Sequence, residues 1–274
     1  MEISNLVNSF ERDMRFERYA ENSIENYLCQ VKMFLWYFKN KDSCKHISVD
    51  EIKDYLLESN ATNSQRHAHS AIKLFYRMTV KQPMKFKYIK YARKEQKLPQ
   101  PLSEQEVKLL FDNCDNTKHK AILSLLFFCG LRVGEVISLR PEHIDRHNMV
   151  IRIISGKGRK DRQSPMSELV LKLLERYYRE YRPKVFMFNG QLKDQYSERS
   201  INEFIKTIGK KAGIKKNLHS HLGRHSCFSQ MLSNGIDMAI IQSIAGHNTI
   251  ETTRIYAKVT SSLINRTTPY NFAI

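Results

Sequence analysis

Apolar side chains recur at intervals of three and four residues through positions 3–78, as they do in helices that bury one face. Four helices are predicted there, beginning at Ile3, Asn22, Ser48 and either Thr62 or Ser64. Asn22 is followed by Glu25 and Ser48 by Glu51, and both spacings are typical of capping boxes at helix N-termini. The pattern therefore predicts a helical N-terminal domain.

The helical pattern stops in a stretch dense in lysine and arginine, in which Glu95 is the only acid. Pro99 and Pro101 follow, and prolines favour an extended chain, as does the high charge density. We expect a linker here, which gives an N-terminal domain of residues 1–97 and a second domain of residues 98–274.

The second domain also reads as mostly helical. Ser103 and Glu106 form a further capping-box pair near its start. Residues 119–129 are apolar on nearly every side, which predicts a buried central helix that ends at Gly130. Helices are also predicted over residues 132–139, 167–181, 198–212, 218–233, 237–245 and 249–257.

Three short segments of the second domain favour β-structure instead. The β-branched run 149–155 and the run 162–165 flank a glycine-containing turn, so together they predict a hairpin. Residues 185–188 predict another short strand. The expected fold class is therefore mainly α with a small antiparallel β-sheet.

Charge indicates the partner. The 274 residues include 45 Lys and Arg against 28 Asp and Glu, a net charge of +17, and residues 1–60 carry a net −3, residues 61–100 a net +9 and residues 101–274 a net +11. A basic surplus that gathers in some regions indicates a polyanionic partner, most often nucleic acid.

Five scattered cysteines without a C-x-x-C pair favour a reducing compartment, and no apolar run is long enough to span a bilayer. We expect a cytoplasmic protein with no membrane partner.

The basic stretch around the predicted linker is a candidate strap over a DNA backbone, with a plain solvated spacer as the alternative. Its candidate DNA-binding residues are Lys85, Lys87, Lys90, Arg93 and Lys94. Arg159 and Lys160, in the turn of the predicted hairpin, are candidates of the same kind.

Five short phrases in the second domain carry residues that suit phosphodiester chemistry. The phrases are G-L-R-V-G-E, G-K-G-R-K-D-R, H-L-G-R-H, A-G-H and T-R-I-Y-A, and the residues of interest in them are Arg132, Lys157, His221, Arg224, His247 and Tyr256. In this order, cations and hydrogen-bond donors precede one candidate nucleophile. Such a set suits the cleavage of a phosphodiester through a covalent tyrosine, without a metal.

The two arginines offer planar, permanently charged groups that match the non-bridging oxygens of a phosphate. Arg132 lies three residues before Glu135, so a surface ion pair on one helix face is the alternative interpretation, and the same carboxylate could orient the guanidinium group. His221 and Arg224 are also three residues apart, and on a helix they would share a face and reach one phosphate.

The remaining candidates are a base, a donor and a nucleophile. His221 is a candidate general base because imidazole titrates at about pH 6.5, with a core histidine as the alternative. His247 follows Gly246 at the expected start of a helix, where an anion is favoured. Tyr256 is the candidate nucleophile, and a phenol with a pKa of about 10 needs a base and cations nearby. Its position alone selects it among 13 tyrosines.

These phrases and their order resemble the tyrosine recombinase, or phage integrase, family, and the chain is most similar to the short Xer-type members that lack an arm-binding domain. The resemblance implies an N-terminal SAM-like core-binding domain and an α+β catalytic domain that together clamp duplex DNA. It also implies that Lys157 is the general acid that protonates the leaving 5′ oxygen, with an ordinary basic turn as the alternative.

The resemblance implies a reaction as well. Tyr256 would attack the scissile phosphate and form a 3′-phosphotyrosine, and integration, inversion or dimer resolution would pass through a Holliday junction. The working unit would be four protomers on two double-stranded DNA sites, as a homotetramer or a heterotetramer with a related recombinase, and no cofactor would be needed. Residues 261–274 would either dock on a neighbouring protomer or fray.

One residue departs from the family pattern, because Gly223 stands where leucine is usual. Glycine inside a helix costs about 0.5–1 kcal/mol relative to alanine. We therefore expect the helix to be looser around His221 and Arg224.

The same residues give less support to other functions. His219, His221, His225 and Cys227 are close in sequence, but a helix would point them in several directions, which disfavours a zinc site. The phrases contain no acidic cluster for a metal-dependent nuclease. The alternatives kept are a topoisomerase-like enzyme that religates a single duplex and a non-catalytic DNA-binding relative.

Overall fold

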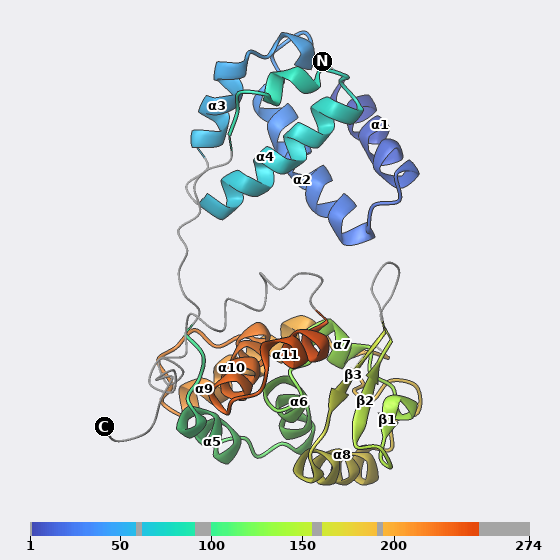
Figure 1. Cartoon of the computed structure of the whole chain (residues 1–274). Helices are drawn as coiled ribbons and strands as arrows, with labels where there is room; N and C mark the ends of the chain where they lie inside the picture. Colours follow the sequence, from blue (N-terminus) through green and yellow to red (C-terminus); the bar gives the residue numbers. More distant parts are fainter. Residues whose placement is uncertain (1, 59–61, 91–99, 155–160, 191–193, 247–274) are drawn as a thin grey trace, which may run out of the picture. The chain divides into compact units, whose positions relative to one another are not determined.

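A computed structural model describes residues 2–58, 62–90, 100–154, 161–190 and 194–246. The chain divides into two compact units, residues 1–96 and residues 97–274 (Figure 1). No helix in the described ranges is both long enough and apolar enough to cross a membrane.

The first unit is a small bundle of helices around an aromatic core. Its elements are α1 (Ile3–Phe16), α2 (Glu21–Tyr37), α3 (Val49–Leu57) and α4 (Thr62–Met78), with 3-10 turns η1 (Cys44–His46) and η2 (Pro83–Phe86). Phe34 of α2 makes edge-to-face contacts with Phe38, Tyr55 and Tyr76, a geometry that aromatic rings favour. The buried Tyr76 hydroxyl donates a 2.7 Å hydrogen bond to the carbonyl oxygen of Cys44, so this ring joins α4 to η1.

Helices α3 and α5 begin at the predicted capping boxes. The hydroxyl of Ser48 accepts from the backbone N–H of Glu51, and the carboxylate of Glu51 accepts from the backbone N–H of Ser48. Ser103 and Glu106 make the same reciprocal pair at the start of α5 in the second unit. Both predictions are confirmed.

Helix α2 begins differently from its prediction. Its first residue is Glu21, the cap position is held by Ala20, and no side chain caps the helix, so the expected cap at Asn22 is wrong. Glu21 lies in the first turn, where a carboxylate is favoured by the helix dipole. It also forms a 2.6 Å ion pair with Arg15 of α1, which holds the connection between the two helices.

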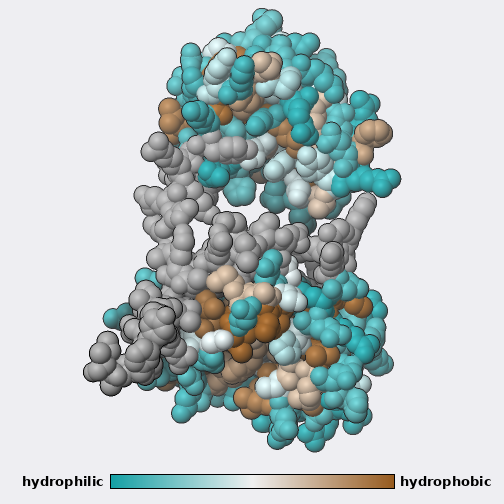
Figure 2. Space-filling view, in the orientation of Figure 1, coloured by the Kyte–Doolittle hydropathy of each residue, from teal (hydrophilic) through white to brown (hydrophobic). Residues whose placement is uncertain are grey.

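The second unit is built around the helix that the apolar run predicted. Its helices are α5 (Glu104–Asp112), α6 (Thr117–Phe127), α7 (Val133–Ile137), α8 (Glu168–Tyr181), α9 (Glu198–Lys211), α10 (Ser220–Ser233) and α11 (Met238–Ala245). Every residue of α6 from Ala121 to Phe127 is buried, and α8 and α10 both pack on α6. Apolar side chains also gather at the surface over α10 and α11 (Figure 2).

A small antiparallel sheet lies beside these helices (Figure 1). Its strands are β1 (Ile144–Asp145), which follows the 3-10 turn η3 (Pro141–His143), β2 (Val150–Ile153) and β3 (Arg162–Pro165), in the order β1-β2-β3. Val150 lies opposite Pro165 and Ile153 opposite Arg162, so the predicted hairpin is confirmed.

The predicted strand at residues 185–188 is wrong, because these residues form a bend. The Met187 N–H donates a 2.7 Å hydrogen bond to the Leu139 carbonyl oxygen, just after α7. Met187 and Phe188 are buried in the core. Their apolar character therefore reflects burial in an irregular segment.

Gly223 allows α10 to lie close to α6. A Cβ atom at this position would come within 3.1 Å of the Leu126 Cβ and of the Phe127 ring. Helix α10 begins at Ser220 and continues through the glycine. Close packing of α10 on α6 therefore explains the departure from the family pattern, and the expected looser helix stays a prediction.

We expect Gly223→Leu to lower the free energy of unfolding by about 1–3 kcal/mol or more, because overpacking forces side chains and backbone to shift. Urea denaturation followed by circular dichroism measures the change. Gly134→Ala is the matched control, because no described atom lies within 4 Å of a Cβ built there. Alanine at that helical position should keep or raise stability by up to about 1 kcal/mol. Equal stability of Gly223→Leu and wild type would contradict the packing account.

Candidate active site

The structure describes part of the predicted site. The predicted catalytic residues within the described ranges are Arg132, His221 and Arg224, together with the supporting Glu135. The predicted residues that lie outside the described ranges are Lys157, His247, Tyr256, Arg93, Lys94, Arg159 and Lys160.

Arg224 is a buried cation that joins three segments of the second unit. Arg224 lies on α10 and is only 4% exposed. Nη1 donates a 2.6 Å hydrogen bond to the carbonyl oxygen of Gly130, and Nη2 donates a 2.5 Å hydrogen bond to that of Ala245 at the end of α11. The guanidinium group also lies 4.7 Å from the ring centre of Phe228, a cation–π contact. A single side chain thus holds the ends of α6 and α11 to α10.

The turn at Gly130 makes this close approach possible. Its φ of +63° lies in the left-handed region, which glycine adopts without a steric penalty. A Cβ atom there would come within 2.8 Å of the Phe228 ring. The next N–H, of Leu131, donates a 3.1 Å hydrogen bond back to the Leu125 carbonyl oxygen and closes the end of α6.

Arg132 stands at the N-terminal cap of α7 and faces Glu135 one turn later. Its backbone N–H donates to Glu135 Oε2 at 2.7 Å, and its Nη1 donates to Oε1 at 3.0 Å. Its Nη2 lies 3.4 Å from the carbonyl oxygen of Gly246, the residue that follows α11. The Glu135 side chain is only 14% exposed. Of the two interpretations left open, this favours a carboxylate that orients the guanidinium group over a surface ion pair.

A third arginine, which the motifs did not single out, completes the group. Arg162 is the first residue of β3, its side chain is 7% exposed, and its Nη2 donates to Glu135 Oε2 at 2.7 Å. Burial lowers the pKa of Arg162, Glu135 raises it, and the cation of Arg132 lowers it again. Strand alternation could have indicated this residue, because it puts Arg162 on the same face as the buried Ser164.

The start of α10 is held by polar contacts that leave His221 at the surface. The Ser220 N–H donates a 2.8 Å hydrogen bond to Asn202 of α9. His219 caps the helix, since its Nδ1 accepts from the Leu222 N–H at 3.2 Å. Burial, followed by the neighbouring His221, lowers the pKa of His219. His221 itself is exposed, whereas Arg224 on the next turn is buried.

The surrounding side chains limit the chemistry. Burial raises the pKa of Cys227 to about 12 and raises that of Cys129 even further, so neither thiol is a thiolate nucleophile at neutral pH. Among the described residues, no group of three or more His, Cys, Asp or Glu side chains is placed to hold a metal ion. Two guanidinium groups, those of Arg132 and Arg162, share the single Glu135 carboxylate, so this cluster carries a net positive charge that favours an anion such as a phosphate.

The basic residues of the first unit differ in their surroundings. The ammonium group of Lys85 donates to the carbonyl oxygens of Lys45 at 2.6 Å and Ile47 at 2.5 Å, and burial lowers its pKa. Lys85 therefore fastens η2 to η1, a packing role that the predicted backbone contact did not anticipate. Lys87 and Lys90 are exposed and stay candidates for DNA contacts.

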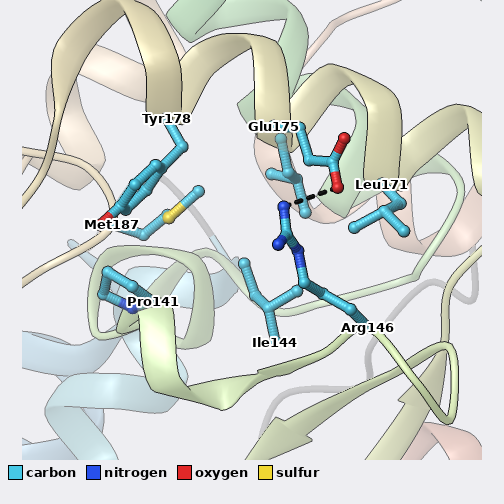
Figure 3. Close-up of a pocket in the computed structure, with 8 residues that line it drawn as sticks. Pro141, Ile144, Arg146, Leu171, Glu175, Tyr178 and Met187 are labelled. Atoms are coloured by element: carbon cyan, nitrogen blue, oxygen red, sulfur yellow. Dashed lines mark hydrogen bonds and ion pairs between the residues drawn. The ribbon is translucent and has the colours of Figure 1, made fainter.

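A pocket of about 290 Å³ lies between α8 and the segment that contains η3 and β1 (Figure 3). Apolar side chains form most of its lining, and Arg146 pairs with Glu175 across it at 2.6 Å. None of the predicted site residues that the structure describes lines this pocket. The pocket is therefore separate from the predicted site residues that the structure describes.

Comparisons with known proteins agree with this fold. Residues 100–262 match the model of the phage integrase family, and residues 6–85 match that of the phage integrase N-terminal SAM-like domain. A tyrosine recombinase of Thermosipho africanus is 31% identical over 258 residues, which cover 88% of this chain and 90% of that protein.

Two solved structures resemble the chain over most of its length. The crystal structure of XerA recombinase is 30% identical, with a TM-score of 0.60 and full coverage of both chains. A post-cleavage complex of XerH site-specific recombinase with its palindromic difH substrate has a TM-score of 0.73 at 20% identity, over 89% of this chain and 78% of that one. The expected fold class, mainly α with a small antiparallel sheet, is confirmed.

Proposed function

Because this chain belongs to the phage integrase family and is a tyrosine-type site-specific recombinase, we propose that it cleaves and rejoins DNA through a 3′-phosphotyrosine at Tyr256. The observation that carries the proposal is the convergence of two arginines on one helix end. Arg132 and Arg224 both donate to carbonyl oxygens at the end of α11, from which the chain continues to Tyr256.

In the proposed step, the Tyr256 hydroxyl attacks the scissile phosphorus and the bond to the 5′ oxygen breaks. His221 takes the phenolic proton, and Lys157 gives a proton to the leaving 5′ oxygen. Arg132 and Arg224, with His247 as a further donor, stabilise the charge on the non-bridging oxygens. One such donor is worth about 10²–10³ in rate in other enzymes. One phosphodiester replaces another, so no nucleotide cofactor is needed.

Recombination then requires a second duplex. We propose that a 5′ hydroxyl of the partner DNA attacks the phosphotyrosine and reverses the bond exchange, and that two rounds pass through a Holliday junction. Four protomers on two DNA sites would supply the four tyrosines, as a homotetramer or with a related recombinase. In this proposal, the N-terminal domain of residues 1–97 and the catalytic domain of residues 98–274 both bind the duplex.

The test is covalent capture of DNA. Genomic fragments trapped on the denatured protein are sequenced to find the site, and a nicked suicide substrate is then built from it. We expect a protein–DNA adduct on a denaturing gel, formed in the presence of EDTA. Absence of the adduct would favour a non-catalytic DNA-binding relative. Relaxation of a supercoiled plasmid that lacks the site would favour the topoisomerase alternative.

DNA affinity should fall steeply with salt, because each phosphate contact contributes about 0.9 to the slope of log K against log [salt]. Lys87→Gln and Lys90→Gln should each weaken binding and reduce the slope by about 1. Fluorescence anisotropy at several salt concentrations measures both quantities.

Lys85→Gln is the internal comparison for these variants. Because the Lys85 ammonium group is bonded to the carbonyl oxygens of Lys45 and Ile47, its loss should lower the stability of the first unit and leave the salt slope unchanged. Unchanged slopes for both Lys87→Gln and Lys90→Gln would contradict the assignment of these lysines to the DNA surface.

A further inference from the structure

Glu135 is shared by two arginines from different parts of the second unit. Its Oε1 accepts from Nη1 of Arg132 at 3.0 Å, and its Oε2 accepts from Nη2 of Arg162 at 2.7 Å. The carboxylate side chain is 14% exposed and the Arg162 side chain 7% exposed. The position of the Arg132 guanidinium group therefore depends on a carboxylate that Arg162 holds from its other side.

Arg162 also lies directly against Gly246. The glycine has a φ of +60°, and a Cβ atom built on it would come within 2.6 Å of Arg162 Cδ and 2.9 Å of its Nε. On the carbonyl side of the same residue, Arg132 Nη2 lies 3.4 Å from the Gly246 oxygen. Helix α11 packs on β3 through this region. The end of α11 is thus in contact with both arginines that share Glu135.

The surroundings of Arg162 are unfavourable for a residue whose role is stability alone. Its Nε and Nη1 atoms are buried and have no hydrogen-bond partner among the described residues. Buried donors without partners destabilise a fold, and well-packed apolar side chains often replace both members of a buried ion pair without loss of stability. Stability alone therefore does not account for a guanidinium group at this position.

We propose that Arg162 is a positioning residue for strand cleavage, which fixes Arg132 through Glu135 and fixes the end of α11 through Gly246. The inference rests on the proposed function, because Arg132 is assigned there to the scissile phosphate. Arg224 donates to the Ala245 carbonyl oxygen at the same helix end. A shift of Arg162 would therefore disturb the placement of both phosphate-binding arginines relative to each other.

The test uses Arg162→Met and Arg162→Gln in the full chain, with single-turnover cleavage of the nicked suicide substrate at saturating DNA. Misplacement of catalytic groups by about 1 Å can cost about 100-fold, so we expect cleavage to slow by about 10- to 100-fold. The dissociation constant for DNA and the melting temperature should stay close to those of the wild type. When Glu135 is already replaced by Gln, Arg162→Met should slow cleavage by a smaller factor than it does in the wild-type protein, because both residues act through Arg132.

Arg146→Met is the matched control, because this exposed arginine also pairs with a carboxylate, that of Glu175 at 2.6 Å. The Arg146→Met variant should cleave DNA at the wild-type rate. Wild-type cleavage by Arg162→Met would overturn the inference. A slowed variant that also loses DNA binding and melting temperature would overturn it too, in favour of a structural role. If Arg162→Met does not fold, Arg162→Gln is judged in the same way, by its cleavage rate and by its DNA affinity and melting temperature. A wild-type protein that forms no adduct would instead overturn the proposed function itself.

Discussion

Arg224→Lys should slow strand cleavage by at least about 10²-fold while DNA remains bound. Removal of one donor to a developing oxyanion costs about 10²–10³ in rate, and a lysine ammonium group replaces a planar fork by a point charge. The arginine donates to Gly130 and Ala245 through two separate nitrogens. A single ammonium group cannot reproduce that spacing, so the end of α11 would also lose its attachment to the end of α6.

Single-turnover cleavage at saturating DNA measures this effect apart from affinity. Arg199→Lys is the control, since this exposed arginine of α9 pairs with Glu203 at 2.9 Å and has no assigned role in the reaction. The control should cleave at the wild-type rate. Cleavage by Arg224→Lys within about threefold of the wild-type rate would exclude Arg224 from the phosphate site, because loss of a transition-state donor has a much larger effect.

Tyr256→Phe should abolish the covalent adduct and leave DNA binding intact. The substitution removes one oxygen atom, which in the proposed step is the nucleophile itself, so no residual route to the phosphotyrosine remains. Gel shift with the intact site measures binding, and the denaturing gel measures the adduct. Tyr270→Phe is the matched control in the same terminal region of the sequence and should retain full activity. An adduct that persists in Tyr256→Phe would show that Tyr256 is not the nucleophile.

The fold could be predicted from the sequence where local rules decide it. The capping pair of Ser48 and Glu51, the all-apolar run of α6 and the β2–β3 hairpin each depend on neighbouring residues, and each is confirmed. The cap at Asn22 was not found because α2 begins one residue earlier, at Glu21, whose carboxylate lies in the first turn and pairs with Arg15 of α1, a contact between helices that local spacing does not show. The strand predicted at residues 185–188 is wrong because Met187 and Phe188 are buried in an irregular segment that has no strand partner.

The chemistry of the site could be predicted from the sequence, but the contacts that hold its residues in place could not. The arginines of the motifs are recognisable because a phosphate needs planar, permanent cations. Strand alternation could indicate that Arg162 faces inward, but not that it contacts Glu135 and Gly246, which are distant from it in sequence. The packing role of Gly223 could not be predicted for a similar reason, because the close approach of α6 to α10 depends on the tertiary arrangement of both helices.

The central claim is that Tyr256 carries the DNA, and peptide mapping of the adduct tests it most directly. Trypsin cleavage after Arg254 and Lys258 releases the peptide 255–258, in which Tyr256 is the one tyrosine. The adduct from the suicide substrate is digested with nuclease and trypsin and analysed by mass spectrometry. The account predicts the nucleotide remnant on peptide 255–258. A remnant on any other peptide, including the one that contains Tyr270, would contradict it.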